Sequence, residues 1–218
     1  MNEPLVIISV CKPFSSALHR ACPPLDSAQA SAAYAAMVLD AEATALSAGA
    51  DVWFACSGQP DAALLAMAAP ETRVVGLSGD TVNDRELAAF AEGFAHGYRR
   101  IAVLSASAPD LPAGYLQTAF DRLEDDPPLV IAVPSQSGAV CMLALARPRP
   151  ELLDGVPWGI SKTAEGLEAA AETLRAPLCM LPRWQTVETM ADLRDCLERG
   201  RAANLKSLAA HGILNVGP

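Results

Sequence analysis

Short apolar runs alternate with helix-forming segments from one end of this chain to the other. The apolar runs expected to form strands cover residues 5–10, 51–56, 73–77, 101–104, 129–133 and 178–181. Helices are expected over residues 27–48, 61–68, 83–96, 112–124, 163–174 and 189–210. Apolar strands that alternate with helices are typical of a parallel sheet covered on both faces. The sequence therefore predicts an α/β protein with three layers, αβα, in a Rossmann-like arrangement.

One further apolar run, residues 139–146, follows the strand at 129–133 directly. A parallel connection needs about a dozen residues for its helical crossover, so this run is expected to pair antiparallel. The predicted sheet is therefore mixed but mostly parallel. Neither an internal repeat nor a linker divides the 218 residues. We expect one domain over residues 1–218, with a loose tail from about residue 211.

The stretch from Arg99 to Pro112, RRIAVLSASAPDLP, indicates where a ligand would bind. Its apolar part is expected to be a buried strand, and a loop of small residues follows. Ligands of open α/β sheets bind just beyond the carboxyl ends of the strands. The loop from Ser105 to Asp110 is therefore the first candidate site, and its first four positions carry no carboxylate.

Charge and composition exclude several classes of function. The net charge of −9 argues against binding nucleic acid or an anionic membrane surface, because both need a cationic footprint. No apolar run reaches about 18 residues, and the acidic N-terminus does not resemble a signal peptide, so a cytoplasmic protein is expected. The six cysteines are scattered and predict free buried thiols. Dinucleotide, P-loop and hydrolase fingerprints are absent, and the three histidines have no metal-ligand spacing.

A series of short motifs follows the predicted strands in a regular order. They are Lys12, Arg20 and Pro23-Pro24, then Asp40, Gly79-Asp80 with Asp84-Arg85, the 99–112 stretch, Ser137-Gly138-Ala139, Pro157-Trp158 and Thr186-Val187-Glu188-Thr189. This order, over about residues 4–197, resembles a bacterial family of uncharacterised glycosyltransferase-A-like proteins, of the domain of unknown function 2064 type. That family is distantly similar to sugar-nucleotide transferases and to 2-phospholactate guanylyltransferase. The resemblance implies a nucleotide-diphospho-sugar transferase fold.

The resemblance also implies a Mg²⁺ or Mn²⁺ ion that bridges the nucleotide phosphates. Such ions prefer carboxylate oxygens. Here Ser107, Ser137 and Thr186 stand at positions where the family has acids, and Leu18 stands where it has a lysine. We therefore expect a degenerate metal site, with no metal ligands and no cofactor that can be assigned.

Two acids are candidates for catalysis. Asp110 could turn toward the site from its position after Ser107, or it could cap the following helix. Glu188 could be a surviving ligand, or it could favour the N-terminus of the last helix. Asp40 is expected to anchor the opening loop by hydrogen bonds.

The predicted ligand- and phosphate-binding residues are Lys12, Arg20, Arg85, Ser107, Ser137 and Gly138. Arginine binds phosphate through two parallel hydrogen bonds. The alternative is that these cations are ordinary solvated charges. Trp158 could form a wall of the pocket or pack in the core.

Two functions fit this pattern. The first is a nucleotide-sugar or nucleotidyl transferase homologue that binds a nucleotide-activated small molecule. The second is a non-catalytic homologue that binds a ligand or a protein partner, for which the Ala-rich helices could serve homo-oligomerisation.

Overall fold

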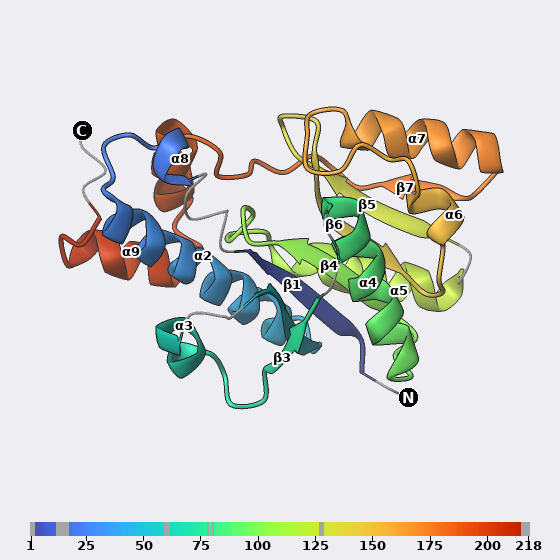
Figure 1. The fold of residues 1–218 in the computed structure, drawn as a ribbon, viewed down its shortest axis with the longest axis horizontal. Helices are drawn as coiled ribbons and strands as arrows, with labels where there is room; N and C mark the ends of the chain where they lie inside the picture. Colours follow the sequence, from blue (N-terminus) through green and yellow to red (C-terminus); the bar gives the residue numbers. More distant parts are fainter. Residues whose placement is uncertain are drawn as a thin grey trace.

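The computed structural model describes residues 3–11, 18–58, 62–77, 79, 81–126 and 129–214. Within them, a single sheet has the strand order β3-β2-β1-β4-β6-β5-β7. The strands are β1 (Leu5–Cys11), β2 (Asp51–Ser57), β3 (Arg73–Gly76), β4 (Ile101–Ser105), β5 (Val130–Pro134), β6 (Val140–Leu145) and β7 (Leu178–Met180). Figure 1 shows this sheet running through the middle of the molecule. All the expected strands are present.

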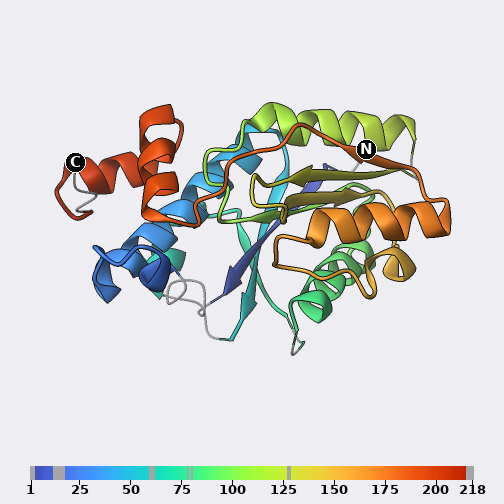
Figure 2. The ribbon, with the colours of Figure 1, turned by 90° about the horizontal axis from the view of Figure 1, so that it is seen from above.

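Helices cover both faces of the sheet, as Figure 2 shows. They are α2 (Ser27–Ser47), α3 (Ala62–Met67), α4 (Val82–Ala95), α5 (Ala113–Asp125), α6 (Pro150–Leu153), α7 (Thr163–Leu174), α8 (Met190–Arg199) and α9 (Ala203–Ala210). One core joins the sheet to α2, α3, α5, α8 and α9, and the other joins it to α4, α6 and α7. The prediction of three layers, αβα, is confirmed.

Alternating side chains of the central strands supply the two cores. Val6 and Ile8 of β1 point toward α2, whereas Leu5 and Ile7 point toward α4, and all four are completely buried. A strand buried on both sides needs apolar residues at every position. This requirement explains the continuous apolar run at the start of the sequence.

β6 is the antiparallel strand that the short connection predicts. It lies between β4 and β5 and pairs antiparallel with both, while the other strand pairs are parallel. Met142 near the start of β6 faces Leu104 near the end of β4. The beginning of β6 and the turn before it therefore lie at the carboxyl edge of the parallel strands.

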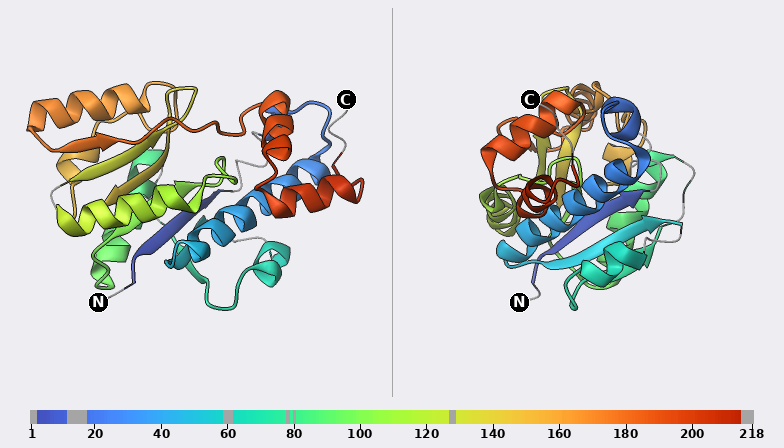
Figure 3. Two further views of the ribbon diagram at one scale, coloured as in Figure 1. Left: turned by 180° about the vertical axis from the view of Figure 1, so that it is seen from behind. Right: turned by 90° about the vertical axis from the view of Figure 1, so that its left-hand side faces the viewer.

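The prediction of one long C-terminal helix is wrong. The segment forms two helices, and Gly200 ends the first with φ of 74° in the left-handed region, which glycine adopts without steric cost. Figures 1 and 3 show α8 and α9 packed beside α2, at one end of the molecule. At the start of α7, Lys162 holds the N-cap position, and the Thr163 hydroxyl bonds to the Pro157 and Ile160 carbonyls.

Asp40 holds the start of α9, and it forms no hydrogen bond with the described part of the opening loop, residues 18–25. Its carboxylate accepts hydrogen bonds from the backbone N–H and the side-chain amide of Asn204, at 2.8 and 2.9 Å, and from the Leu205 N–H at 3.1 Å. The first N–H groups of a helix have no partners within the helix, and α9 has no side-chain cap of its own. Asp40, only 4% exposed, supplies that cap from another helix.

We predict that Asp40→Ala lowers the free energy of unfolding by about 2 kcal/mol, because it leaves buried N–H groups of α9 without an acceptor. Urea denaturation followed by circular dichroism measures this. Asp121→Ala, on the exposed side of α5, is the control and should change stability by less than about 0.5 kcal/mol. Equal effects of the two substitutions would contradict the capping role.

No helix in the described part of the chain has the length and apolar character needed to cross a membrane.

Candidate functional site

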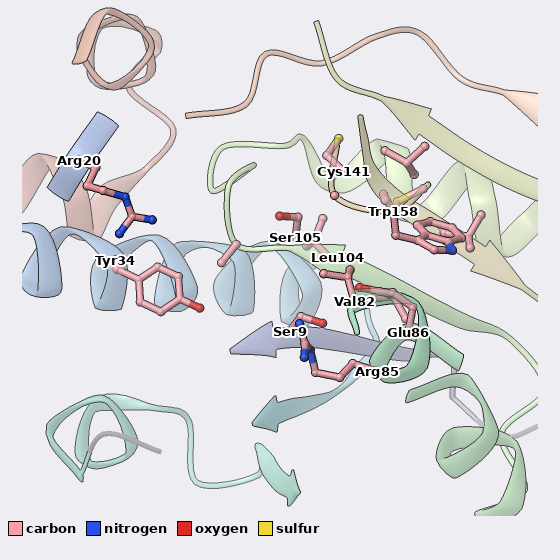
Figure 4. A pocket seen from close by; sticks show the side chains of 16 residues that line it. Ser9, Arg20, Tyr34, Val82, Arg85, Glu86, Leu104, Ser105, Cys141 and Trp158 are labelled. Atoms are coloured by element: carbon pink, nitrogen blue, oxygen red, sulfur yellow. The ribbon is translucent and has the colours of Figure 1, made fainter. Parts of the chain in front are cut away.

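A cavity of about 390 Å³ opens at the carboxyl edge of β1 and β4, and its lining includes residues from both faces of the sheet. Figure 4 shows its walls. They are formed by Ser9, Arg20, Tyr34, Val82, Arg85, Glu86, Val103, Leu104, Ser105, Ala106, Val140, Cys141, Met142, Leu143, Trp158 and Gly159. Elements that are distant in the sequence thus meet at the edge where ligands of α/β sheets bind.

Two serines form a polar floor on neighbouring strands. Ser9 of β1 is paired in register with Ser105 at the end of β4. Both residues follow the alternation that points Leu5, Ile7, Ile101 and Val103 toward α4. Hydroxyl groups therefore replace apolar side chains where the two strands reach the cavity.

Two arginines bring positive charge to the cavity. Arg85 lies beside Ser9 in the first turns of α4, and Arg20 lies near Tyr34 (Figure 4). The Arg85 guanidinium donates a 3.4 Å hydrogen bond to the carbonyl of Gly79. Gly79 has φ of +136°, and a Cβ there would come within 2.5 Å of the Asp84 side chain, so this turn requires glycine.

Glu86 follows Arg85 and also lines the cavity. Burial raises the pKa of its carboxyl group to about 7, against the opposing effects of the Arg85 charge and a hydrogen bond with Ser9. A carboxyl group that titrates near neutrality can gain or lose a proton under ordinary conditions, and such groups are concentrated at functional sites.

Trp158 both packs in the core and forms a wall of the cavity, so the two alternatives are not exclusive. It is half-buried against the second core, and its indole N–H donates a 3.1 Å hydrogen bond to the Leu153 carbonyl. With Val82, which is 39% exposed, it gives the cavity an apolar side opposite the polar floor.

A group of hydroxyls lies next to the cavity, around one carboxylate. The Glu188 carboxylate accepts hydrogen bonds from Ser137 at 2.9 Å and from Thr186 at 2.7 Å. Ser135 is 2.8 Å from the Ser137 hydroxyl. The predicted residues Ser137 and Glu188 are thus in direct contact, although they come from a turn and a distant loop.

Ser107 connects this group to the cavity. Its hydroxyl is 2.7 Å from that of Ser105, and its carbonyl accepts a 2.7 Å hydrogen bond from the N–H of Val187. Gly138 shapes the turn beside Ser137: its φ is +93°, and a Cβ would lie 2.1 Å from the Ser161 carbonyl oxygen. Only glycine fits there.

These groups do not fit a divalent cation. In this group Ser107, Ser137 and Thr186 offer neutral hydroxyls, and Glu188 offers the one carboxylate. Two of the hydroxyls donate hydrogen bonds to that carboxylate. Mg²⁺ and Mn²⁺ need several hard oxygen ligands, preferably charged. Among the described residues, no three His, Cys, Asp or Glu side chains form a group that could hold a metal ion.

Asp110 does not cap α5, whose N-cap is Pro112 and has no side-chain hydrogen bond. Its carboxylate, completely buried, forms an ion pair with Arg199 of α8 at 2.5 Å and accepts a 3.1 Å hydrogen bond from the indole of Trp184. This bond with Asp110 raises the pKa of Arg199. Asp110 thus joins the loop after β4 to α8.

The structure therefore brings together most of the predicted site residues. Arg20 and Arg85 line the cavity, and Ser107, Ser137, Gly138 and Glu188 lie beside it. Lys12, Asp80 and the tail 215–218 fall outside the described residues.

Sequence reasoning missed Ser9, Tyr34 and Glu86. Ser9 had a detectable signal, because it is the one polar residue in the apolar run 5–10. Glu86 had no such signal, because in the sequence it cannot be distinguished from an ordinary charge on the surface of a helix.

The sheet order and the helices on both faces define a three-layer α/β protein with a cavity at the carboxyl edge of its sheet. A family profile described as "Uncharacterized protein conserved in bacteria (DUF2064)" matches residues 39–160. The match covers more than half of the chain, which therefore belongs to this bacterial family. No curated protein matches the sequence.

Solved structures share the fold. A crystal structure from Desulfovibrio desulfuricans, provisionally assigned as a nucleotide-diphospho-sugar transferase, has a TM-score of 0.80 at 20% identity and covers 96% of each chain. CMP:2-keto-3-deoxy-manno-octonic acid synthetase in complex with CTP has a TM-score of 0.54 at 16% identity, covering 95% of this chain and 100% of that one. A nucleotidyl transferase from Methanothermobacter has a TM-score of 0.57 at 16% identity, with 95% and 100% covered. The predicted fold class, nucleotide-diphospho-sugar transferase-like, is confirmed.

The raised pKa of Glu86 makes stability depend on pH. The folded protein holds this proton more tightly than the unfolded chain does, so the contribution of Glu86 to stability is greatest below pH 4.5 and is lost as pH rises to about 7. We expect Glu86→Gln to be more stable than the parent at pH 8 by about 1–3 kcal/mol, with a smaller gain at pH 5.

Urea denaturation at the two pH values measures this difference. Glu168→Gln, on the exposed side of α7, is the control and should change the free energy of unfolding by the same small amount at both pH values. A gain from Glu86→Gln that is the same at pH 5 and pH 8 would show that this carboxyl is not the titrating group.

Proposed function

We propose that this protein binds a nucleotide-activated small molecule, such as a nucleotide sugar, in the cavity at the carboxyl edge of β1 and β4. The observation that carries the proposal is the cavity lined by two guanidinium groups and two serine hydroxyls on a fold shared with nucleotidyl and nucleotide-sugar transferases. The net charge of −9 and the scattered cysteines support a role on small molecules in the cytoplasm, away from nucleic acid.

Arginine would take over part of the charge compensation that a divalent ion gives in related enzymes. A guanidinium is always charged and binds phosphate oxygens through two hydrogen bonds. Arg85 is positioned from α4 and Arg20 from the helical segment 18–21. The serine hydroxyls of the floor can donate to the same oxygens. A transfer reaction in this site would rest on positioning and on these fixed charges.

The second candidate is a homologue that binds its ligand without transferring a group. The hydrogen bonds that Glu188 accepts from Ser137 and Thr186 favour it, since the carboxylate is occupied within the protein. Asp110, the other candidate acid, is likewise occupied within the protein, because it forms an ion pair with Arg199. Both candidates require ligand binding and differ only in turnover.

Isothermal titration calorimetry with UDP-glucose, GDP-mannose, ADP-glucose and CTP, each with and without Mn²⁺, tests the proposal. Binding of at least one nucleotide without Mn²⁺ is the expected result. Binding that requires Mn²⁺ would contradict the degenerate metal site, and no binding under any condition would contradict the nucleotide function. Release of nucleotide on incubation with sugar acceptors would then separate the two candidates.

Arg85→Ala should weaken binding of the nucleotide at least tenfold, because one hydrogen-bonded charge contact to phosphate is lost. Arg147→Ala removes an exposed charge at the opposite end of β6 and should change the affinity by less than twofold. Calorimetry on both variants gives the comparison. Equal losses would mean that only the overall charge of the protein matters.

Ser107→Asp should create affinity for Mn²⁺ if the equivalent position holds a metal in the family. The new carboxylate would replace a hydroxyl that lies 2.7 Å from the Ser105 hydroxyl. It would stand on the loop that accepts a hydrogen bond from the Val187 N–H. Titration with Mn²⁺, followed by electron paramagnetic resonance, measures the number of bound ions. Ser207→Asp, on α9, is the control and should bind none. Unchanged Mn²⁺ binding in Ser107→Asp would contradict the assignment of this position.

A further inference from the structure

A positively charged and an acidic side chain lie side by side in the cavity wall. Arg85 and Glu86 are adjacent on α4, both line the cavity, and Glu86 is hydrogen-bonded to Ser9 on its floor. Most of the other lining side chains are apolar. In such surroundings an anionic ligand and an ionised Glu86 repel each other strongly, because apolar walls screen charges less than bulk water does.

Arg85 links the ligand to the proton. Its positive charge lowers the pKa of Glu86 and so favours the ionised carboxylate. A bound phosphate would contact the same guanidinium. Two anionic groups, the phosphate and the Glu86 carboxylate, would then share one cation. The least costly response is protonation of the carboxyl group, which then becomes a hydrogen-bond donor.

We propose that the cavity takes up one proton, at the Glu86 carboxyl, when it binds an anionic ligand beside Arg85. This inference rests on the proposed function, since it assumes an anion in this cavity. The proton comes from solvent and returns to it on release, so the site binds its ligand and a proton as a unit. Linkage is reciprocal: acid conditions must strengthen binding of the anion by the same amount that the anion strengthens binding of the proton.

The other groups around Glu86 leave this carboxyl as the one that titrates near neutral pH. The titratable and polar side chains that line the same cavity are Arg20, Tyr34, Arg85, Cys141, Ser9 and Ser105. The arginines stay charged. Burial raises the pKa of Cys141 to about 12, so it stays a neutral thiol. Asp84, which precedes Arg85 on α4, accepts hydrogen bonds from Thr81 and is not part of the cavity lining.

Calorimetric titration with UDP-glucose, GDP-mannose and ADP-glucose at pH 6, 7 and 8 tests the inference. The phosphates of these sugar nucleotides do not titrate in this range, so a pH dependence reports on the protein. Binding should be about tenfold weaker at pH 8 than at pH 6. At pH 7.5, the heats measured in HEPES and in Tris should differ by the uptake of about half to one proton per ligand.

Glu86→Gln mimics the protonated carboxyl group. It should bind with the same affinity at all three pH values, about tenfold tighter than the parent at pH 8, and without proton uptake. Glu92→Gln, on the same helix but outside the cavity, should keep the pH dependence of the parent.

The possible failures are distinguishable. Binding that is independent of pH, or proton uptake that persists in Glu86→Gln, would overturn the proton-linked inference and leave the nucleotide function standing. Absence of binding at every pH would overturn the proposed function, and this inference with it.

Discussion

The parallel pairing of β1 with β4 is the constraint on which the rest of the structure depends. The two strands are paired from Leu5 and Ile101 to Ser9 and Ser105, and they are almost completely buried until the serines are reached. Each face of this strand pair is covered by its own layer of helices, with α2 on one face and α4 on the other. Their pairing ends at Ser9 and Ser105, and the cavity opens at this edge. The architecture and the site thus follow from one pair of strands.

Much of the fold could be predicted from the sequence, because burial of a strand on both faces leaves a signal that is local. The apolar runs identified the strands, and the short connection after Pro134 identified the antiparallel β6. The break between α8 and α9 was missed because the helical pattern continues past Gly200. There the left-handed backbone of one glycine outweighs the propensity of its neighbours.

The site was only partly predictable, and the reason is physical. The resemblance to the family grouped Ser107, Ser137 and Glu188 in one site, and the structure brings them to one edge. The environment of Glu86 depends on Ser9 and on the wall around Trp158, which are brought together by the tertiary fold alone. Likewise, no local pattern indicates that Asp40 serves α9 or that Asp110 pairs with Arg199.

The antiparallel direction of β6 separates the parts of the chain that carry stability from the parts that carry chemistry. Because β6 starts at the cavity edge, its turn, with Ser137 and Gly138, meets the loops that hold Ser107 and Glu188. These polar residues lie on connections, whereas the strands beneath them contribute mainly packing. Charged and polar residues at this edge can therefore be exchanged while the buried sheet stays unchanged, so the same scaffold can carry different binding chemistry.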